Sequence, residues 1–552
     1  MIRRALLLVA LCACNTEPPT PLLTPPHQQV SAHGDTPRRG GILELATLGD
    51  VRSLDPASVV DGIAPELVEL IFAGLVDYDA NGNLVPDLAE TYERSADGLH
   101  YDFHLRPALQ FHNGAALRSY DVKGSIERAL GPSAPNPSRD FFKSLLGYED
   151  FVNGKTPHLE GVQTFGPLHV RLVLREPDAT FERALPSLAL RPVCATMESV
   201  WSANAHPCGA GPFELKRWER GNVIELTRFP AYHRRGLPYL DGVRMTLHVS
   251  MLSQRFRFER GEQHVLRELS AQDELAFASD PRWQPYVHQR AATQMNAEGM
   301  NTEVPPFDNV DVRRAVSFAI DREAYVKLRP YALTPLTQPV PQGVLGHNAK
   351  LGCQRYDLEE ARRLMAKAGY PYDPLRKTGG YPHEIPYVAY RKGLTEYTAQ
   401  LLKQQLAEIG LRLDLRMVSY STYLALSHRR HGTAMSYQGW SMDFSDPSNF
   451  TETLFHSSAI ADDDANNTAF YNNRALDQLL DQAKRELDEP RRLALYDRAQ
   501  QILCDDAPWA FTYSIRWTLL TQPFVRGFAP HAMWMYDLSH TWLGAPDPKV
   551  AR

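Results

Sequence analysis

A helix, a glycine and a strand follow one another without interruption in the C-terminal half of this 552-residue chain. Leu402, Leu406 and Ile409 recur at the spacing of one helix face, and Gly410 follows them directly. From residue 411 to residue 417 apolar and polar side chains alternate, which is the period of a strand with one buried face. Because glycine commonly ends helices and a strand begins at once, this order is typical of helices packed on a sheet. The sequence therefore predicts an α/β fold.

The same alternation of short strands and amphipathic helices extends along the chain from Gly40. It predicts strands at 43–46, 101–105, 170–174, 224–226 and 243–249, and helices at 64–75, 358–368, 475–487 and 491–504. No internal repeat is visible in the sequence. A chain of this length has room for more than one domain, each with its own core.

The N-terminus differs from everything that follows it. Arg3 and Arg4 precede the apolar run 5–11, which is far shorter than the roughly 20 residues needed to span a bilayer. These properties are typical of an export signal, and the following Cys-Ala-Cys resembles a bacterial lipobox. We therefore predict a lipoprotein signal over residues 1–14, with the lipid attached to Cys14. The alternative is an ordinary secretory signal.

Residues 15–39 are rich in Pro, Thr and other polar residues and have neither a helix nor a strand period. Such a segment predicts an extended, disordered tether between a membrane anchor and a folded domain. No later segment of the sequence is long and apolar enough to be a membrane span. We therefore expect attachment to the membrane through the lipid anchor only, in the periplasm or cell envelope.

Four cysteines remain outside the signal, namely Cys194, Cys208, Cys353 and Cys504. Four cysteines allow three pairings, and the sequence alone does not choose among them. The short separation of the first two favours a bridge between them, which leaves a second bridge between the other two. Free, buried cysteines are the alternative. The cysteines are not accompanied by a CxxC or paired-histidine spacing, so the sequence predicts no zinc site.

The charge balance and the absence of catalytic motifs exclude several classes of function. The formal net charge is -6, and no part of the chain is strongly basic, so we predict no nucleic-acid partner. The sequence contains no Gly-x-Ser-x-Gly, no His-Glu-x-x-His and no phosphate-binding loop. We therefore predict that the chain is not an enzyme and needs neither a cofactor nor a metal.

Six segments, in order, are similar to one known family. They include GGILELATLGDVRSLDPA at 40–57, PFDNVDVRRAVSFAIDRE at 306–323 and GWSMDFSDPSNF at 439–450. The other three are 71–122, 209–232 and 356–371. Together they resemble the bacterial extracellular solute-binding proteins of family 5, which include the oligopeptide- and dipeptide-binding proteins of ABC importers. One departure is Ala73, which stands where relatives often have glutamate.

The resemblance implies a two-lobed periplasmic-binding-protein fold of type II, with an extra subdomain inserted in the first lobe and a ligand cleft between the lobes. It also implies that the chain crosses between the lobes twice. The predicted divisions are the signal 1–14, the tether 15–39, the start of lobe I at 40–86, the inserted subdomain 87–208, the rest of lobe I at 209–292, lobe II at 293–522 and a return to lobe I at 523–552.

The acidic end of a predicted ligand site comes from the segment Gly439-Trp440-Ser441-Met442-Asp443. In peptide-binding relatives an aspartate three residues after a tryptophan binds the α-ammonium group of the ligand, so the resemblance assigns this role to Asp443. Trp440 and Gly439 are predicted to contribute to the same site, Trp440 as an aromatic wall near the cation. The alternative is that Asp443 and Asp446 cap a loop, with Trp440 in the core.

A peptide also needs a basic partner for its carboxylate, because burying an unpaired charge costs several kcal/mol. The candidates are Arg391, Arg429 and Arg430, each of which has the alternative of being a solvated surface arginine. In relatives that bind long peptides an arginine can stand three residues before the tryptophan, but that position is Tyr437 here.

The predicted function is the substrate-binding component of an ABC importer. We expect a monomer that captures di- or oligopeptides by closure of its lobes and delivers them to permease subunits, with cytoplasmic ATPases behind them. A non-peptide solute on the same fold, such as a nickel complex, haem or an oligosaccharide, is one alternative. A peptide-sensing receptor is another.

Overall fold

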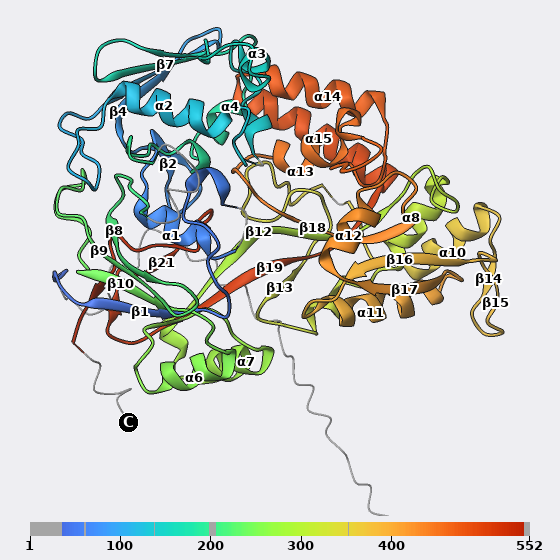
Figure 1. Ribbon diagram of the computed structural model, residues 1–552. Helices are drawn as coiled ribbons and strands as arrows, with labels where there is room; N and C mark the ends of the chain where they lie inside the picture. The colour runs from blue at the N-terminus through green and yellow to red at the C-terminus, as the bar shows by residue number, and fades with distance from the viewer. Residues whose placement is uncertain (1–35, 60–61, 137, 198–205, 352, 546–552) are drawn as a thin grey trace, which may run out of the picture.

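The computed structural model describes residues 36–59, 62–136, 138–197, 206–351 and 353–545. The predicted signal, with Cys14, lies outside the described residues, as does most of the predicted tether. The described chain forms two lobes connected by the long strands β12 and β19 (Figure 1). A two-lobed α/β fold was predicted, and it is confirmed.

The first lobe contains a four-stranded sheet in the order β1-β10-β9-β8. Its strands are β1 (Ile42–Ala46), β8 (Phe213–Glu219), β9 (Val223–Arg228) and β10 (Gly242–Thr246). Helix α1 (Ala64–Ile71) packs near β8. The helix ends four residues before the predicted Leu75, because the backbone of Phe72 is already extended at φ -119° and ψ 145°.

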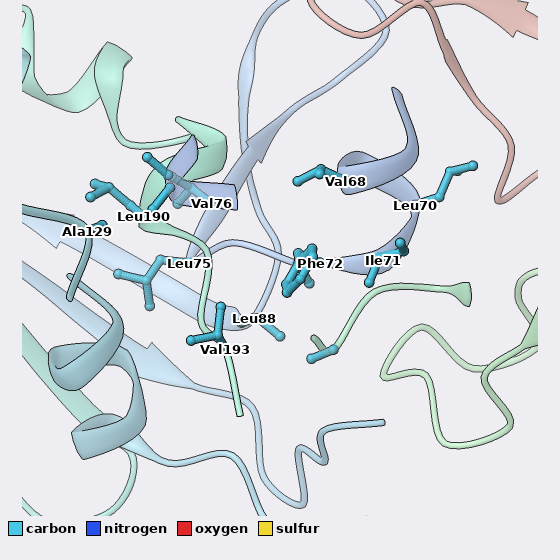
Figure 2. Close-up of a cluster of buried hydrophobic side chains, with 14 of the residues drawn as sticks. Val68, Leu70, Ile71, Phe72, Leu75, Val76, Leu88, Ala129, Leu190 and Val193 are labelled. Atoms are coloured by element: carbon cyan, nitrogen blue, oxygen red, sulfur yellow. The ribbon is translucent and has the colours of Figure 1, made fainter. Parts of the chain in front are cut away.

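A second four-stranded sheet of the first lobe is antiparallel, in the order β4-β5-β7-β6. Its strands are β4 (Ala89–Arg94), β5 (His100–Leu105), β6 (Val162–Thr164) and β7 (His169–Val173). Helix α2 (Ser119–Leu130) packs on β6 and β7. Figure 2 shows side chains of α1 and of the segment after it together with Leu190 and Val193, which belong to one buried cluster with both sheets. One core therefore joins the inserted sheet to the first lobe.

Shorter elements complete the first lobe. They are β2 (Val76–Tyr78), β3 (Leu84–Pro86), α3 (Tyr148–Val152), α4 (Phe181–Ala184), α6 (Met251–Glu259), β11 (Val265–Leu266), α7 (Ala271–Ser279), β20 (Val525–Arg526), β21 (Ala529–Pro530), β22 (Tyr536–Asp537) and β23 (Trp542–Leu543). The last four bring the C-terminal part of the described chain back beside its beginning, since apolar side chains of β20, β22 and β23 join the first-lobe core or pack against it.

The third large sheet contains seven strands, in the order β11-β19-β12-β18-β16-β17, with β13 also paired to β19. Its further strands are β12 (Val287–Met300), β13 (Leu333–Pro335), β16 (Glu384–Tyr390), β17 (Arg412–Val418), β18 (Met435–Ser441) and β19 (Trp509–Thr521). Strands β16, β17 and β18 are parallel to one another, whereas β12 and β19 are antiparallel.

Helices surround this sheet in the second lobe (Figure 1). They are α8 (Val310–Ala319), α9 (Arg322–Val326), α10 (Leu358–Lys367), α11 (Thr395–Ala407), α12 (Tyr420–Ser427), α13 (Ser448–Phe455), α14 (Arg474–Arg485) and α15 (Glu489–Asp506), with the small hairpin β14 (Tyr372–Asp373) and β15 (Thr378–Gly379). The helices predicted at 358–368, 475–487 and 491–504 correspond to α10, α14 and α15.

Strands β12 and β19, of 14 and 13 residues, are long enough to reach from one lobe to the other, about 45 Å. At one end β19 pairs with β11 of the first lobe, and at the other β12 pairs with β18 of the second. Their register is irregular between Ala291 and Met295, in the middle of the pair. The two strands are thus the connection on which the lobes are mounted.

Two disulfides are present, Cys194–Cys208 and Cys353–Cys504, which is the pairing that the sequence favoured. The first closes a short loop in the first lobe, and the second fixes the segment before α10 to helix α15. In the part of the chain that the structure describes, no helix combines the length and the apolar character of a membrane span. The exact domain boundaries stay a prediction.

Candidate ligand-binding site

A cavity of about 550 Å³ lies between the two lobes. Its first-lobe wall consists of residues from four segments, within 56–66, 136–141, 184–189 and 530–535. The opposite wall consists of Arg290, Thr293 and Gln294 of β12, Trp517 of β19, Lys392 and residues 441–444. Thr293 and Gln294 are consecutive, and both reach the cavity because the irregular register of β12 interrupts the usual alternation of faces.

Asp443 lies in this wall, in the loop between β18 and α13. The fully buried Asn449 holds the loop in place through its side-chain amide. Asn449 Nδ2 donates to Asp443 Oδ2 at 3.1 Å, and Asn449 Oδ1 accepts from the Asp443 backbone N–H at 2.9 Å. The same oxygen accepts from Trp440 Nε1 at 3.0 Å. Asn449 therefore fixes the position of the carboxylate, a role that sequence reasoning missed.

The Asp443 carboxylate has no cationic partner among the described residues, and although the residue is exposed towards the cavity, nearby protein atoms displace part of its water. This desolvation raises the pKa of Asp443 to about 6, and the hydrogen bond from Asn449 opposes the rise. At neutral pH the carboxylate is therefore mostly ionised. An ammonium group in the cavity would pair with this carboxylate and favour its ionised form.

The neighbouring Asp446 has a different environment. It is fully buried, and its two carboxylate oxygens accept from Arg492 at 2.6 Å each. It also accepts from the Ser448 backbone N–H at the start of α13. The loop-capping alternative thus describes Asp446 well, whereas Asp443 is left open to the cavity.

Trp440 and Gly439 are close to Asp443 in sequence but do not line the cavity. Trp440 is half-buried and packs against the apolar cluster that includes residues of α13, α14 and α15. Its indole reaches the site only through Asn449. Gly439 is exposed on β18, beside the Tyr437 hydroxyl. Direct ligand contact by these two residues stays a prediction that the cavity does not support.

The three arginines predicted for the ligand carboxylate are also absent from the cavity wall. Each is exposed and has an acidic neighbour. The pairs are Arg391 with Glu396 at 3.4 Å, Arg429 with Asp463 at 2.8 Å, and Arg430 with Glu303 at 2.6 Å. Their surroundings match the surface alternative, and we do not assign them a ligand here.

Two other cations, which the sequence did not single out, do line the cavity. They are Arg290 in β12 and Lys392 after β16. Neither makes an ion pair with a described carboxylate, whereas the acid Glu66 in the opposite wall is paired with Arg267 and accepts from the Tyr536 hydroxyl at 2.8 Å. The cavity therefore presents one uncompensated acid and two uncompensated cations.

The rest of the wall is rich in methionine and aromatic side chains, which adapt to ligands of varied shape. They include Met442, Met533, Met535, Phe141, Trp517 and Trp534. Trp534 is fixed from behind, because its indole N–H donates to Asp77 at 3.0 Å and the Arg191 guanidinium lies over its ring at 5.3 Å.

The lobes are in contact around the cavity, so this is a closed form. The backbone N–H of Ser445 in the second lobe donates to the Tyr78 hydroxyl of the first at 3.1 Å. Phe444 packs edge-on against Phe141, with ring centroids 5.0 Å apart, and joins the first-lobe core. The loop that carries Asp443 thus forms part of the contact between the two lobes. No group of three or more His, Cys, Asp or Glu side chains among the described residues is placed to hold a metal ion.

The molecule thus has two lobes, joined by a pair of long strands, with a cavity between them that is lined by charged side chains without partners. This arrangement is that of a two-lobed solute-binding protein. Comparison with known families agrees. The model of "bacterial extracellular solute-binding proteins, family 5 Middle" matches residues 83–462. The chain belongs to this family, whose members are exported, as the resemblance of six segments predicted.

Relatives and solved structures extend this similarity over most of the chain. The glutathione-binding protein GsiB of Pectobacterium atrosepticum is 26% identical over 492 residues, 86% of this chain and 89% of its own. The structure of DppA from Helicobacter pylori, in complex with the peptide STSA, has a TM-score of 0.74 at 24% identity and covers 92% of this chain and 99% of its own. Clavulanic acid biosynthesis oligopeptide binding protein 2 has a TM-score of 0.83 at 22% identity, over 92% and 96%.

Proposed function

We propose that this protein binds peptides in the cavity between its lobes and delivers them to the permease of an ABC importer. The observation that carries the proposal is the position of Asp443, an ionised carboxylate that faces the cavity without a cation. A peptide's α-ammonium group would compensate it. Relatives of the same family that are named for glutathione and oligopeptides support the same class of ligand.

The adaptable wall of the cavity fits this class of ligand. Methionine and aromatic side chains can accommodate different side chains of a peptide, while a fixed acid holds the end that all peptides share. Closure then brings Phe444 and Ser445 against the first lobe. A ligand that contacts both walls favours the closed form by the difference between its affinities for the two forms.

For delivery, we propose that the mature protein is held at the membrane by a lipid on Cys14 and acts as a monomer. The support is the sequence of the N-terminal 14 residues and of the polar segment that follows. The intact mass of the protein purified from bacterial membranes, compared with that of Cys14→Ser, measures the anchor directly.

Asp443→Asn tests the peptide proposal. This change keeps the hydrogen bonds to Asn449 but removes the charge, so affinity for free short peptides should fall by about tenfold or more. N-acetylated peptides, which lack the ammonium, should bind the variant and the parent equally. Titration calorimetry with both peptide forms measures the difference.

The matched control is Asp463→Asn, which removes an exposed carboxylate of the same lobe outside the cavity. It should leave both affinities unchanged. Equal losses for free and acetylated peptides in Asp443→Asn would remove the ammonium role, and failure of the parent protein to bind any peptide would overturn the proposed function itself.

A further inference from the structure

Arg290 is placed where the long strands pass between the lobes. Its register partner across the strand pair is Trp517 of β19, so the two side chains lie on one face of the sheet, and both line the cavity. Nη1 of Arg290 donates to the Pro530 carbonyl oxygen at 2.8 Å. This bond fixes the guanidinium between the connecting strand and the first-lobe segment that carries Met533 and Trp534.

The charge of Arg290 is not compensated within the described chain. No described carboxylate forms an ion pair with it, and Asp79 acts on it only at longer range. Desolvation lowers the pKa of Arg290 to about 10, so the group stays protonated at neutral pH. An arginine has five N–H donors in a planar fork, and the structure gives a partner to the one nitrogen that bonds Pro530. The remaining edge matches the two oxygens of a carboxylate.

The other charged residues of the cavity help to identify which side chain can anchor a ligand carboxylate. Glu66 is neutralised by Arg267, and Asp443 is the acid that faces the cavity without a cation. Lys392 also lines the cavity, but it is largely exposed and therefore bears little desolvation cost. Among the cations of the wall, Arg290 gains most from a ligand carboxylate.

We propose that Arg290 binds a carboxylate of the ligand, and that the preferred ligand is a short peptide whose free amino and carboxyl ends both lie within this one cavity. The inference rests on the proposed function and adds the second anchor and a limit on length. A cavity of about 550 Å³ is in the range of small-molecule sites, so about two to four residues can be enclosed. The two anchors come from the β18–α13 loop and from the connecting strand β12, and both line the same cavity.

The experiment uses two libraries of Ala-X-Ala tripeptides, with X covering all amino acids, one with free and one with amidated C-termini. Each is incubated separately with the purified full chain, and bound peptides are quantified by native mass spectrometry. The parent protein should retain free acids at least tenfold better than amides. Arg290→Gln should lose this preference by weakening the free acids alone, and Arg290→Lys should restore part of it.

Arg391→Gln is the matched control, since it makes the same substitution at an exposed surface arginine that does not line the cavity. It should keep the parent's preference. An unchanged preference in Arg290→Gln, or none in the parent, would overturn the carboxylate anchor while leaving peptide binding intact. A parent protein that retains neither library would contradict the proposed function. If Arg290→Gln loses its fold, as thermal unfolding would show, Arg290→Lys decides: a folded lysine variant that keeps part of the preference for free acids supports the anchor, and a folded variant without any preference opposes it.

Discussion

Glu298 is an acid buried in β12 among aromatic side chains of the second lobe. It is 1% exposed, and its hydrogen-bond partner is the Tyr387 hydroxyl, which donates to Oε2 at 2.7 Å. Burial raises the pKa of Glu298 to about 8, so the side chain is mostly protonated in the folded protein at neutral pH. The unfolded chain releases this proton near pH 4.5. Between these two values the folded state binds more protons, and its stability must fall as the pH rises.

We therefore expect Glu298→Gln to flatten the pH dependence of stability. The parent should lose up to about 1.4 kcal/mol per pH unit through this group between about pH 5 and pH 8, whereas glutamine keeps the shape and the acceptor without titrating. Denaturant unfolding of both proteins at pH 5, 6.5 and 8 measures this difference. Parallel curves for the two proteins would show that Glu298 does not hold its proton in the folded state.

At the scale of single residues, a candidate ligand-binding residue could be predicted from the sequence only where a recognisable motif contained it. Asp443 could be located because it stands three residues after Trp440, and the structure places it in the cavity wall. Arg290 could not, because its segment has no motif and its importance comes from the cavity that the fold builds around it. Asn449 belongs to the segment GWSMDFSDPSNF, which resembles the family and also contains Asp443. Its position shortly after Asp443 was the sequence signal that could have indicated its role in holding the carboxylate.

At the scale of elements, Gly410 shows what a helix-ending glycine adds beyond stopping a helix. It follows α11 with φ at +79°, and a Cβ there would lie 2.6 Å from the Gly380 Cα and 2.8 Å from a Tyr372 ring carbon. Gly369 follows α10 with φ at +91° and has no neighbouring atom within 4 Å of such a Cβ. The two positions share the backbone strain but differ in packing.

Alanine substitutions at these two positions therefore separate strain from close packing. Gly369→Ala should cost about 1 kcal/mol, the cost of a left-handed conformation for a residue with a Cβ. Gly410→Ala should cost about 2–4 kcal/mol, since overpacking against backbone is added. Denaturant unfolding measures both. Equal losses of stability in the two variants would mean that the segment around Gly380, which follows the β14–β15 hairpin, moves aside at no cost in free energy.

Elements were predictable where a one-sided hydrophobic pattern existed, as in α10 and α14. Strand β12 was not predicted from its pattern, because VHQRAATQMNAEGM has no alternation of apolar and polar residues. Its residues instead meet the ligand cavity and the partner strands, and they include buried polar groups such as Glu298. Tertiary surroundings, rather than local propensity, make this segment a strand.

On the scale of the whole molecule, closure is supported by a second contact region between the inserted sheet's loops and helices α14 and α15 (Figure 1). The Ala179 backbone N–H donates to the Lys484 carbonyl at 2.7 Å, and Lys484 Nζ lies 3.7 Å from Asp178. Nearby, Arg183 and Glu489 form an ion pair at 2.9 Å. None of these residues lines the ligand cavity, so they stabilise the closed form without contacting the ligand.

Glu489→Arg should weaken closure by placing a like charge beside Arg183. An exposed pair is worth up to about 1 kcal/mol, and a like-charge contact opposes closure by a similar amount. Affinity should therefore fall about three- to tenfold, by the same factor for every peptide and with the preferences for free termini unchanged. Small-angle scattering of the ligand-free variant should show a larger radius of gyration, since more of the population is open.

The control for this change is Asp497→Arg, which makes the same charge change on the same helix, at a residue without an ion pair in the described structure and outside the cavity wall. It should bind as the parent does. High salt should shrink the effect of Glu489→Arg, because the Debye length falls from about 10 Å at 0.1 M to about 3 Å at 1 M salt, so that exposed charges in contact are then screened. If both variants bind peptides alike, the contact at α15 does not contribute to closure. A loss that differs among peptides would instead mean that α15 acts on the ligand site, because a change confined to the equilibrium between open and closed forms scales all affinities by one factor.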